Sequence, residues 1–171
     1  MKLIVKKQAW KVYIPKMASV ALVILLGGAA FMTRFRIGID SQIDRCIPNY
    51  SVYLIDLNNN NLEKDKIYAF KAKGLQPLFK DGTWMVKYLR AIPGDVVEVS
   101  PLMDVKVNER TLASGLPLIM KIGGNEKNFV GKKKLLDDQF WVMGSSFTSF
   151  DSRYWGTIKQ EQIIGRAYPI F

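Results

Sequence analysis

Cys46 and Lys87 are the two residues of this chain whose types most directly suggest chemistry. The chain holds one cysteine, in the stretch Arg45-Cys46-Ile47-Pro48, and no histidine. The lack of histidine excludes histidine-based triads and imidazole metal sites, and a single thiolate cannot build a zinc cage. We therefore expect no metal and no cofactor. A hydrolytic mechanism would need carboxylates, or a Ser or Cys nucleophile with a lysine base.

Lys87 stands out by the strand face on which it falls. If residues 82–92, GTWMVKYLRAI, form a strand, their side chains alternate between its two faces. Lys87 then shares an otherwise apolar face with Met85, Leu89 and Ala91. It is either a snorkelling lysine on an edge strand or a buried one. Burial disfavours the ammonium form and makes a lysine amine available as a general base.

The N-terminal part of the chain is typical of a membrane anchor. Residues 1–16 hold five lysines and no acidic residue, and residues 17–33, MASVALVILLGGAAFMT, carry no charge. This run is at the short end of the about 17–25 residues that span a bilayer, and the lysines favour a cytoplasmic N-terminus. We expect a single-pass transmembrane helix in the inner (plasma) membrane, with residues 34–171 outside the cytoplasm. A cleavable signal peptide is the alternative, and a buried core helix fits the flanking lysines less well.

Residues 34–171 predict a mainly β domain with antiparallel strands. Runs rich in β-branched and aromatic residues are bounded by Gly, Pro, Asn and Asp, and no long stretch after residue 36 has clear helical periodicity. Residues 113–136 are rich in glycine and lysine and are expected to form an exposed insertion. The predicted strands are residues 51–57, 66–73, 82–92, 96–100, 104–109, 139–144 and 162–168.

Two motifs resemble those of the signal peptidase I family. Residues 87–95, KYLRAIPGD, resemble its pattern Lys-Arg-x-x-Gly-x-Pro-Gly-Asp, in which the lysine is the general base. This motif ends in the turn Pro93-Gly94-Asp95, which Asp95 is expected to cap. Residues 149–156, SFDSRYWG, resemble the family's box Ser-x-Asp-Ser-Arg-x-x-Gly. The resemblance implies a signal peptidase I-like antiparallel β domain with one N-terminal transmembrane helix.

The same resemblance implies roles for the residues of the second motif. Ser149 would hydrogen-bond the Lys87 amine and orient it. Asp151 and Arg153 would form a structural ion pair that braces their loop. Ser152 is a turn or strand hydroxyl in its simplest interpretation.

Cys46 stands where one branch of the family has its nucleophile. In the TraF-type branch, which processes conjugative pilins, the nucleophile is the serine of a Ser-x-Pro tripeptide. The matching tripeptide here is Cys46-Ile47-Pro48. A thiol, with an unperturbed pKa of ~8.5, needs less activation than a hydroxyl. Ser41 is the alternative nucleophile, although its spacing to the proline does not fit, and many free cysteines are simply small buried apolar residues.

The chain also departs from the family pattern at several positions. Tyr88 follows the lysine in place of arginine, Ala91 replaces a glycine, and residues 144–146 read Gly-Ser-Ser where Gly-Asp-Asn is usual. Asp44 stands where some members have a serine that helps to form the oxyanion hole. Because an aspartate would repel an oxyanion, we expect backbone N–H groups, including that of Cys46, to stabilise it.

These observations predict a membrane-anchored endopeptidase that acts on an exported, membrane-tethered protein, with a pilin precursor as the expected substrate. A thioester intermediate would favour transfer to an amine and could join the pilin ends into a ring. We expect the substrate strand to pair with an edge strand near residues 51–57. The alternative is a non-catalytic, membrane-anchored assembly factor that keeps the fold. No nucleic-acid partner is expected, because positive charge concentrates before the apolar segment and in residues 121–134.

Overall fold

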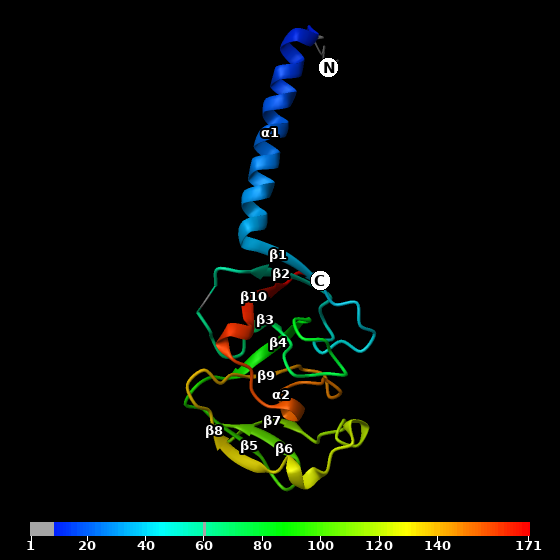
Figure 1. The fold of residues 1–171 in the computed structure, drawn as a ribbon, viewed down its shortest axis with the longest axis vertical. Helices are drawn as coiled ribbons and strands as arrows, with labels where there is room; N and C mark the ends of the chain where they lie inside the picture. The colour runs from blue at the N-terminus through cyan, green and yellow to red at the C-terminus, as the bar shows by residue number, and fades with distance from the viewer. Residues whose placement is uncertain (1–8, 60) are drawn as a thin grey trace, which may run out of the picture. The chain divides into compact units, whose positions relative to one another are not determined.

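The N-terminal unit of the protein is one long apolar helix. A computed structural model describes residues 9–59 and 61–171, which divide after Phe35 into two compact units. The first unit contains α1, Trp10–Arg34 (Figure 1). Its 25 residues rise about 37 Å, and an 18-residue window reaches a mean hydropathy of 1.9. By length and composition α1 is therefore able to cross a hydrocarbon core of about 30 Å.

The helix is longer than the apolar segment expected from the sequence. Residues 17–33 lie inside α1, and the helix begins seven residues earlier, at Trp10, so that it also includes Lys11, Pro15 and Lys16. No side chain of α1 is buried, which suits a helix whose apolar surface meets lipid. Three of the five N-terminal lysines, Lys2, Lys6 and Lys7, lie outside the described residues.

The second unit contains two sheets (Figure 1). The larger sheet has the strand order β1-β2-β10-β3-β4-β9, and the smaller has the order β7-β6-β5-β8. Neighbouring strands pair antiparallel at β2–β10, β10–β3, β3–β4 and β4–β9, and throughout the smaller sheet. The prediction of a mainly β, antiparallel fold behind an N-terminal apolar helix is confirmed.

Among the described residues, seven strands lie within a few residues of the predicted runs, and three strands, at residues 35–39, 110–114 and 131–134, were not predicted. The six strands of the larger sheet are β1 Phe35–Ile39, β2 Val52–Asp56, β3 Ile67–Lys71, β4 Trp84–Ala91, β9 Trp141–Met143 and β10 Ile163–Pro169. The smaller sheet comprises β5 Val96–Val99, β6 Asp104–Val107, β7 Arg110–Ser114 and β8 Gly131–Lys134. The short helices are α2 Ser152–Trp155 and the 3-10 turns Met120–Ile122, Glu126–Asn128 and Gln160–Gln162.

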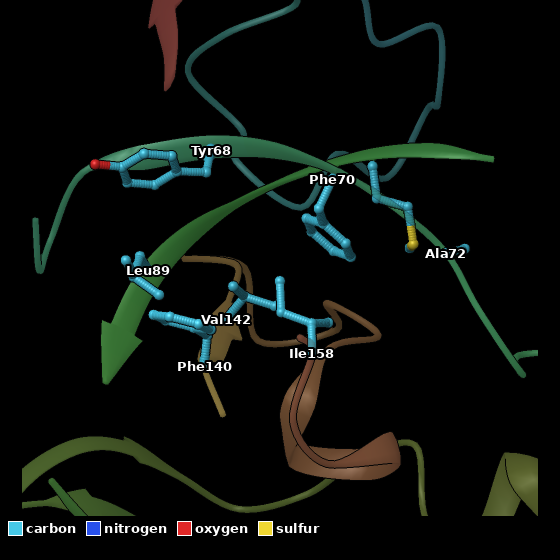
Figure 2. Close-up of a cluster of buried hydrophobic side chains, with 8 residues drawn as sticks. Tyr68, Phe70, Ala72, Leu89, Phe140, Val142 and Ile158 are labelled. Carbon is cyan, nitrogen blue, oxygen red and sulfur yellow. The ribbon is translucent and has the colours of Figure 1, made fainter. Parts of the chain in front are cut away.

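The main apolar core lies against one face of β3 and β4. Tyr68 and Phe70 of β3 and Leu89 of β4 pack with Val142 of β9 and with Ile158 (Figure 2). All five side chains are buried, and full burial of a side chain of this size contributes about 1.5–3 kcal/mol. The core therefore holds the central strands, which carry the residues of chemical interest, in fixed register.

β4 has the alternation that the sequence predicted. Met85, Lys87, Leu89 and Ala91 are buried, and the residues between them are more exposed. Lys87 is 1% exposed. It is therefore not a snorkelling residue, and the structure favours the interpretation as a buried lysine.

Residues 113–136 differ from the expected exposed insertion. Residues 131–134 form β8, which pairs antiparallel with β5 in the smaller sheet. Leu116, Ile119 and Leu135 are buried in the core of this sheet. The lysine side chains of β8 are exposed because β8 is an edge strand, and edge strands commonly carry lysine. A segment that reads as polar in the sequence is thus part of the sheet.

Candidate active site

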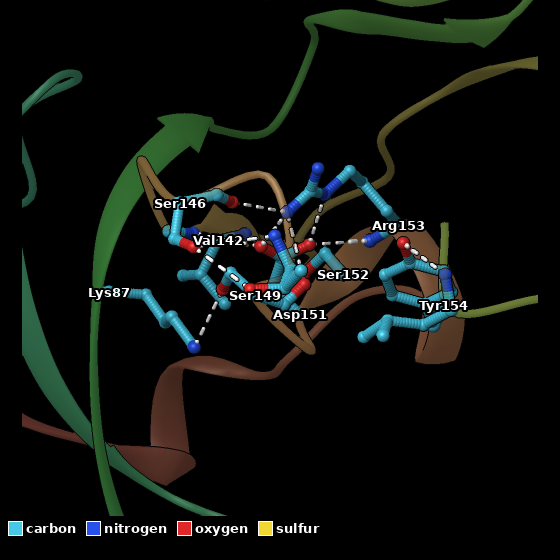
Figure 3. A network of polar contacts seen from close by, with 11 residues as sticks. Lys87, Val142, Ser146, Ser149, Asp151, Ser152, Arg153 and Tyr154 are labelled. Atoms are coloured by element: carbon cyan, nitrogen blue, oxygen red, sulfur yellow. Dashed lines mark hydrogen bonds and ion pairs between the residues drawn. The ribbon is translucent and has the colours of Figure 1, made fainter. Parts of the chain in front are cut away.

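The amine of Lys87 lies inside the body and has one hydroxyl partner from the second motif. Nζ of Lys87 donates to Oγ of Ser149 at 2.9 Å (Figure 3). Ser149, like Lys87, is 1% exposed. A lysine amine in this position is shielded from bulk water and oriented by the hydroxyl, as a general base requires.

Asp151 and Arg153 form a buried ion pair next to Ser149 (Figure 3). Nε and Nη2 of Arg153 donate to the two carboxylate oxygens of Asp151 at 2.7 and 2.8 Å. Burial alone lowers the pKa of the Arg153 guanidinium, but hydrogen bonding and charge attraction to Asp151 outweigh burial and raise it. The bidentate geometry of the pair fixes the loop that carries Ser149.

Further hydrogen bonds tie this ion pair to the neighbouring chain. Asp151 accepts from the backbone N–H of Gly144 at 2.9 Å. Arg153 Nη2 donates to the carbonyl oxygens of Ser149, at 3.0 Å, and Ser146, at 3.3 Å. The side chain of Ser152 also braces the structure, since its Oγ accepts from the N–H of Val142 on β9 at 3.0 Å. The motif therefore holds α2, β9 and the intervening loop together.

Cys46 is attached to the same loop through its main chain. Its carbonyl oxygen accepts hydrogen bonds from the N–H groups of Ser145, at 2.9 Å, and Ser146, at 3.1 Å. Gly144 permits this close approach, since a Cβ on it would lie 2.5 Å from the Cys46 oxygen and 2.3 Å from Ser149 Oγ. The thiol is free and partly exposed. Sequence reasoning noted residues 144–146 only as a departure from a motif, because backbone donors leave no side-chain pattern.

One cavity brings the predicted catalytic residues together. Cys46, Lys87 and Ser41 all line a cavity of about 300 Å³. Residues 38–42, from the end of β1 onward, and residues 83–87 of β4 and its approach contribute much of the lining. The arrangement thus gathers a cysteine, a serine and a buried lysine around one cavity. Such a site can bind an extended peptide and perform acyl transfer.

Tyr53 is a lining residue that sequence reasoning did not single out. It occupies a buried position of β2, and its hydroxyl donates to the carbonyl of Tyr50 at 3.3 Å. Burial, and secondarily the charge of Asp40, raises the pKa of Tyr53 to about 12. The cavity wall therefore holds a neutral hydroxyl here. The available signal was alternation, because Tyr53 falls on the inward face of the strand at residues 51–57.

The turn after Lys87 lies at the junction of the two sheets, outside the lining of the cavity. Gly94 adopts φ of 90°, and Asp95 accepts from the N–H of Ile92 at 3.0 Å. Asp95 also accepts from Asn108 at 2.7 Å and Lys64 at 3.1 Å. Burial raises the pKa of Asp95, but these hydrogen bonds outweigh it and lower the pKa. The side chain thus caps the turn and joins β4 to β5 and the end of β6.

Among the described residues, no group of three or more His, Cys, Asp or Glu side chains is placed to hold a metal ion.

In the comparisons with known proteins, the chain is similar to members of one family, the signal peptidases. The family described as signal peptidase, peptidase S26, matches residues 10–171. A probable signal peptidase I-2 of Synechocystis sp. is 34% identical over 104 residues, which cover 60% of this chain and 42% of that protein. A signal peptidase I of Leptolyngbya laminosa is 30% identical over 95 residues, covering 50% of this chain and 40% of that protein.

The matches to these curated relatives span about two fifths of their length. A crystal structure of a signal peptidase I from Enterococcus faecalis V583 is similar with a TM-score of 0.40 and 21% identity. That similarity covers 64% of this chain and 98% of the other. Since the family match extends from the start of α1 to the last residue, the chain belongs to the signal peptidase family.

Proposed function

We propose that this protein is a membrane-anchored endopeptidase of the signal peptidase type, with Cys46 as nucleophile and Lys87 as general base. The observation that carries the proposal is the buried Lys87 amine, which is hydrogen-bonded to Ser149 and lines one cavity with Cys46. A lysine amine held beside a nucleophile can act as the general base in a chain that lacks histidine.

Main-chain contacts support Cys46 over Ser41 as the nucleophile. Both residues line the cavity. Only Cys46 is tied by its own carbonyl to the loop of residues 144–149 that also carries the hydroxyl partner of Lys87. A nucleophile fixed to the loop whose Ser149 hydroxyl binds the base keeps the geometry that proton transfer requires. Ser41 follows the end of β1 and is exposed.

The proposed reaction proceeds through a thioester. Lys87 Nζ accepts the proton of the Cys46 thiol, and Sγ attacks the carbonyl carbon of the scissile peptide bond. When the C–N bond breaks, the leaving amine takes the proton from Lys87. Water, deprotonated by Lys87 Nζ, then attacks the thioester carbonyl carbon. The C–S bond breaks, the leaving Cys46 thiolate takes the proton back from Lys87, and the carboxylic acid product is released.

The oxyanion requires a donor other than the loop N–H groups. Those of Ser145 and Ser146 already bind the Cys46 carbonyl, so we assign them to positioning of the nucleophile. Asp44 is exposed and does not line the cavity. We propose the N–H of Cys46 as the donor that stabilises the oxyanion.

The free half of β4 is the proposed docking edge for the substrate. The expectation of an edge strand near residues 51–57 is wrong, since β2 lies between β1 and β10. β9 pairs with β4 only from Tyr88 to Ala91. Residues 84–87 therefore extend beyond β9 with one main-chain edge uncovered by it, beside the cavity. An extended peptide can add to such an edge as a strand, with its scissile bond near Lys87.

The proposed substrate is an exported protein tethered in the same membrane, and a pilin precursor is our specific hypothesis. α1 would act as the anchor in the inner membrane, with the N-terminus in the cytoplasm and the body outside. Thioesters react with amines more readily than oxygen esters do. The thioester would therefore allow an N-terminal amine to replace water and give a cyclic product.

The test is coexpression of a pilin precursor with the full chain, followed by intact-mass measurement of the product. Cys46→Ala and Lys87→Ala are expected to abolish processing, and Ser41→Ala is expected to retain it. Cys46→Ser tests whether oxygen can replace sulfur. A cyclic product would be lighter than the linear one by one water.

Two outcomes would overturn parts of this proposal. Full processing by Cys46→Ala together with its loss in Ser41→Ala would transfer the role of nucleophile to Ser41. If the native chain does not process the pilin precursor, and none of these variants changes the mass of the precursor, the result would favour the non-catalytic assembly factor. A linear product from the native chain would exclude cyclisation.

A further inference from the structure

A second cavity lies on another side of the loop that holds Cys46. It has a volume of about 360 Å³ and is lined by β7, the end of β4, the loop of residues 144–147 and Arg153. The Cys46 and Lys87 cavity, at about 300 Å³, has a different set of lining residues. The loop N–H groups of Ser145 and Ser146 bind Cys46, so the second cavity is separated from the nucleophile by one loop.

The walls of this second cavity are cationic. Arg90, Arg110 and Arg153 line it, and no aspartate or glutamate is among the described residues that do so. Asp151 neutralises Arg153, and Asp65 lies beside both Arg90 and Arg110. Three guanidinium groups thus face two carboxylates, which leaves one positive charge in excess.

Arg110 is the cation most available to a ligand. Its Nη1 lies 3.9 Å from Asp65, and the side chains are 74% and 50% exposed. An exposed pair at this distance contributes little to stability. A carboxylate brought into the cavity can form two parallel hydrogen bonds with the planar guanidinium, so Arg110 would gain a better partner than Asp65.

The apolar and hydroxyl groups of the cavity suit a peptide. Phe147 lines it and is 60% exposed, and Ser145 and Thr111 add hydroxyl groups. Aromatic side chains and arginine are the residues enriched at protein-binding surfaces. The chain has 25 basic and 15 acidic residues, and residues 1–33 hold five of the basic residues and none of the acidic ones. Residues 34–171 therefore carry 20 basic and 15 acidic residues. A basic body also favours an acidic partner.

We propose that this cavity is a second binding site, which takes an acidic segment of the peptide substrate through Arg110 and its neighbours. The proposal rests on the proposed peptidase function for the identity of the occupant. The site would hold aspartate or glutamate side chains that lie away from the scissile bond. It would select among exported proteins without taking part in bond cleavage.

The experiment measures peptide binding to the full chain in uncharged detergent micelles. The probe is a short fluorescent peptide that alternates glutamate with glycine, compared by anisotropy with its glutamine counterpart. The variant is Arg110→Glu, and the matched control is Lys132→Glu. Lys132 is an exposed cation on β8 that lines a different cavity. Using the Cys46→Ala background for every measurement separates binding from cleavage.

We expect the glutamate peptide to bind, Arg110→Glu to weaken it about tenfold or more, and Lys132→Glu to leave it unchanged. Added salt should weaken binding of the glutamate peptide to the chain with native Arg110 and have little effect on its binding to Arg110→Glu. Equal weakening by both variants, or equal binding of the glutamine peptide, would overturn the site. Competition by inorganic phosphate or by phosphatidylglycerol vesicles as effective as the glutamate peptide would overturn the peptide as occupant.

A cleavage readout connects the site to the substrate. The assay uses a pilin precursor with glutamates placed away from the scissile bond and a version with glutamine at the same positions. Arg110→Glu should raise KM for the glutamate version alone, with kcat unchanged. If peptide binding fails while Cys46 and Lys87 prove essential, only this inference falls. If those residues prove dispensable while the peptide still binds at Arg110, the proposed mechanism falls and the site stands.

Discussion

Gly144→Ala is the substitution that most directly tests how the candidate site is built. Gly144 lies where Cys46, Ser149 and the Asp151 carboxylate approach one chain segment. An added Cβ would lie 2.3 Å from Ser149 Oγ, 2.5 Å from the Cys46 carbonyl oxygen and 2.7 Å from Ser149 Cβ. Non-bonded atoms of these kinds pack at about 3.5 Å. Ser149 and Cys46 must therefore each move by roughly 1 Å.

The size of the expected effect follows from these displacements. Overpacking of a tight site typically costs about 1–3 kcal/mol, which for a chain of this size lowers Tm by roughly 2–12 °C. The effect on rate should be larger, because a displacement of about 1 Å in a reacting group can lower the rate about 100-fold. The variant should thus fold at moderate temperature and process substrate poorly.

Gly131→Ala is the matched control for this measurement. Gly131 lies on exposed β8, and a Cβ there would meet nothing within 4 Å. Circular dichroism gives Tm for both variants, and intact-mass measurement of the coexpressed pilin precursor gives the rate. If Gly144→Ala matched Gly131→Ala in both Tm and rate, close packing at Gly144 would not position Cys46 and Ser149.

Two further predictions concern stability. Asp151→Asn leaves the buried Arg153 charge without its carboxylate partner and should reduce the free energy of unfolding by about 3–5 kcal/mol in urea denaturation. Glu161→Gln, in the exposed pair with Lys73, should cost at most about 1 kcal/mol; equal losses would contradict the distinction. Because the pKa of Asp95 is lowered on folding, its carboxylate stabilises the protein above about pH 4, and this contribution is lost as pH falls through the lowered pKa. Asp95→Asn should therefore lower Tm at pH 7, and the difference from the native Tm should shrink as the pH falls below about 4; a difference independent of pH would refute this.

The strand pattern could be predicted where one face of a strand is buried. In β4 the alternation at residues 84–91 was visible in the sequence, because a period of two leaves few ways to place four buried side chains. β8 was missed for the opposite reason. Its four residues are all exposed, and main-chain hydrogen bonds to β5, which leave no side-chain pattern, make it a strand.

The candidate site shows the same division between side-chain and main-chain information. The motif resemblance named Lys87, Ser149 and Asp151, and the structure places them side by side. The partners of the Cys46 carbonyl are N–H groups, which every residue but proline possesses, so residue types could not reveal them. β2 is internal because it pairs with β1 and with β10, which is far away in the sequence, and the residues of β2 alone do not indicate these partners.

The way in which Cys46 is held bears on whether sulfur can be exchanged for oxygen at the proposed nucleophile. Its position is set by two hydrogen bonds to its carbonyl oxygen and by burial of Ile47 beside it, and its thiol makes no part of that anchor. Exchange of sulfur for oxygen should then leave the main chain where it is and change only the reacting atom. Cys46→Ser should keep the native Tm, so any change in the ratio of cyclic to linear product would report the chemistry of the acyl intermediate. A shift in Tm comparable to that of Gly144→Ala would show instead that the side chain helps to hold the nucleophile in place.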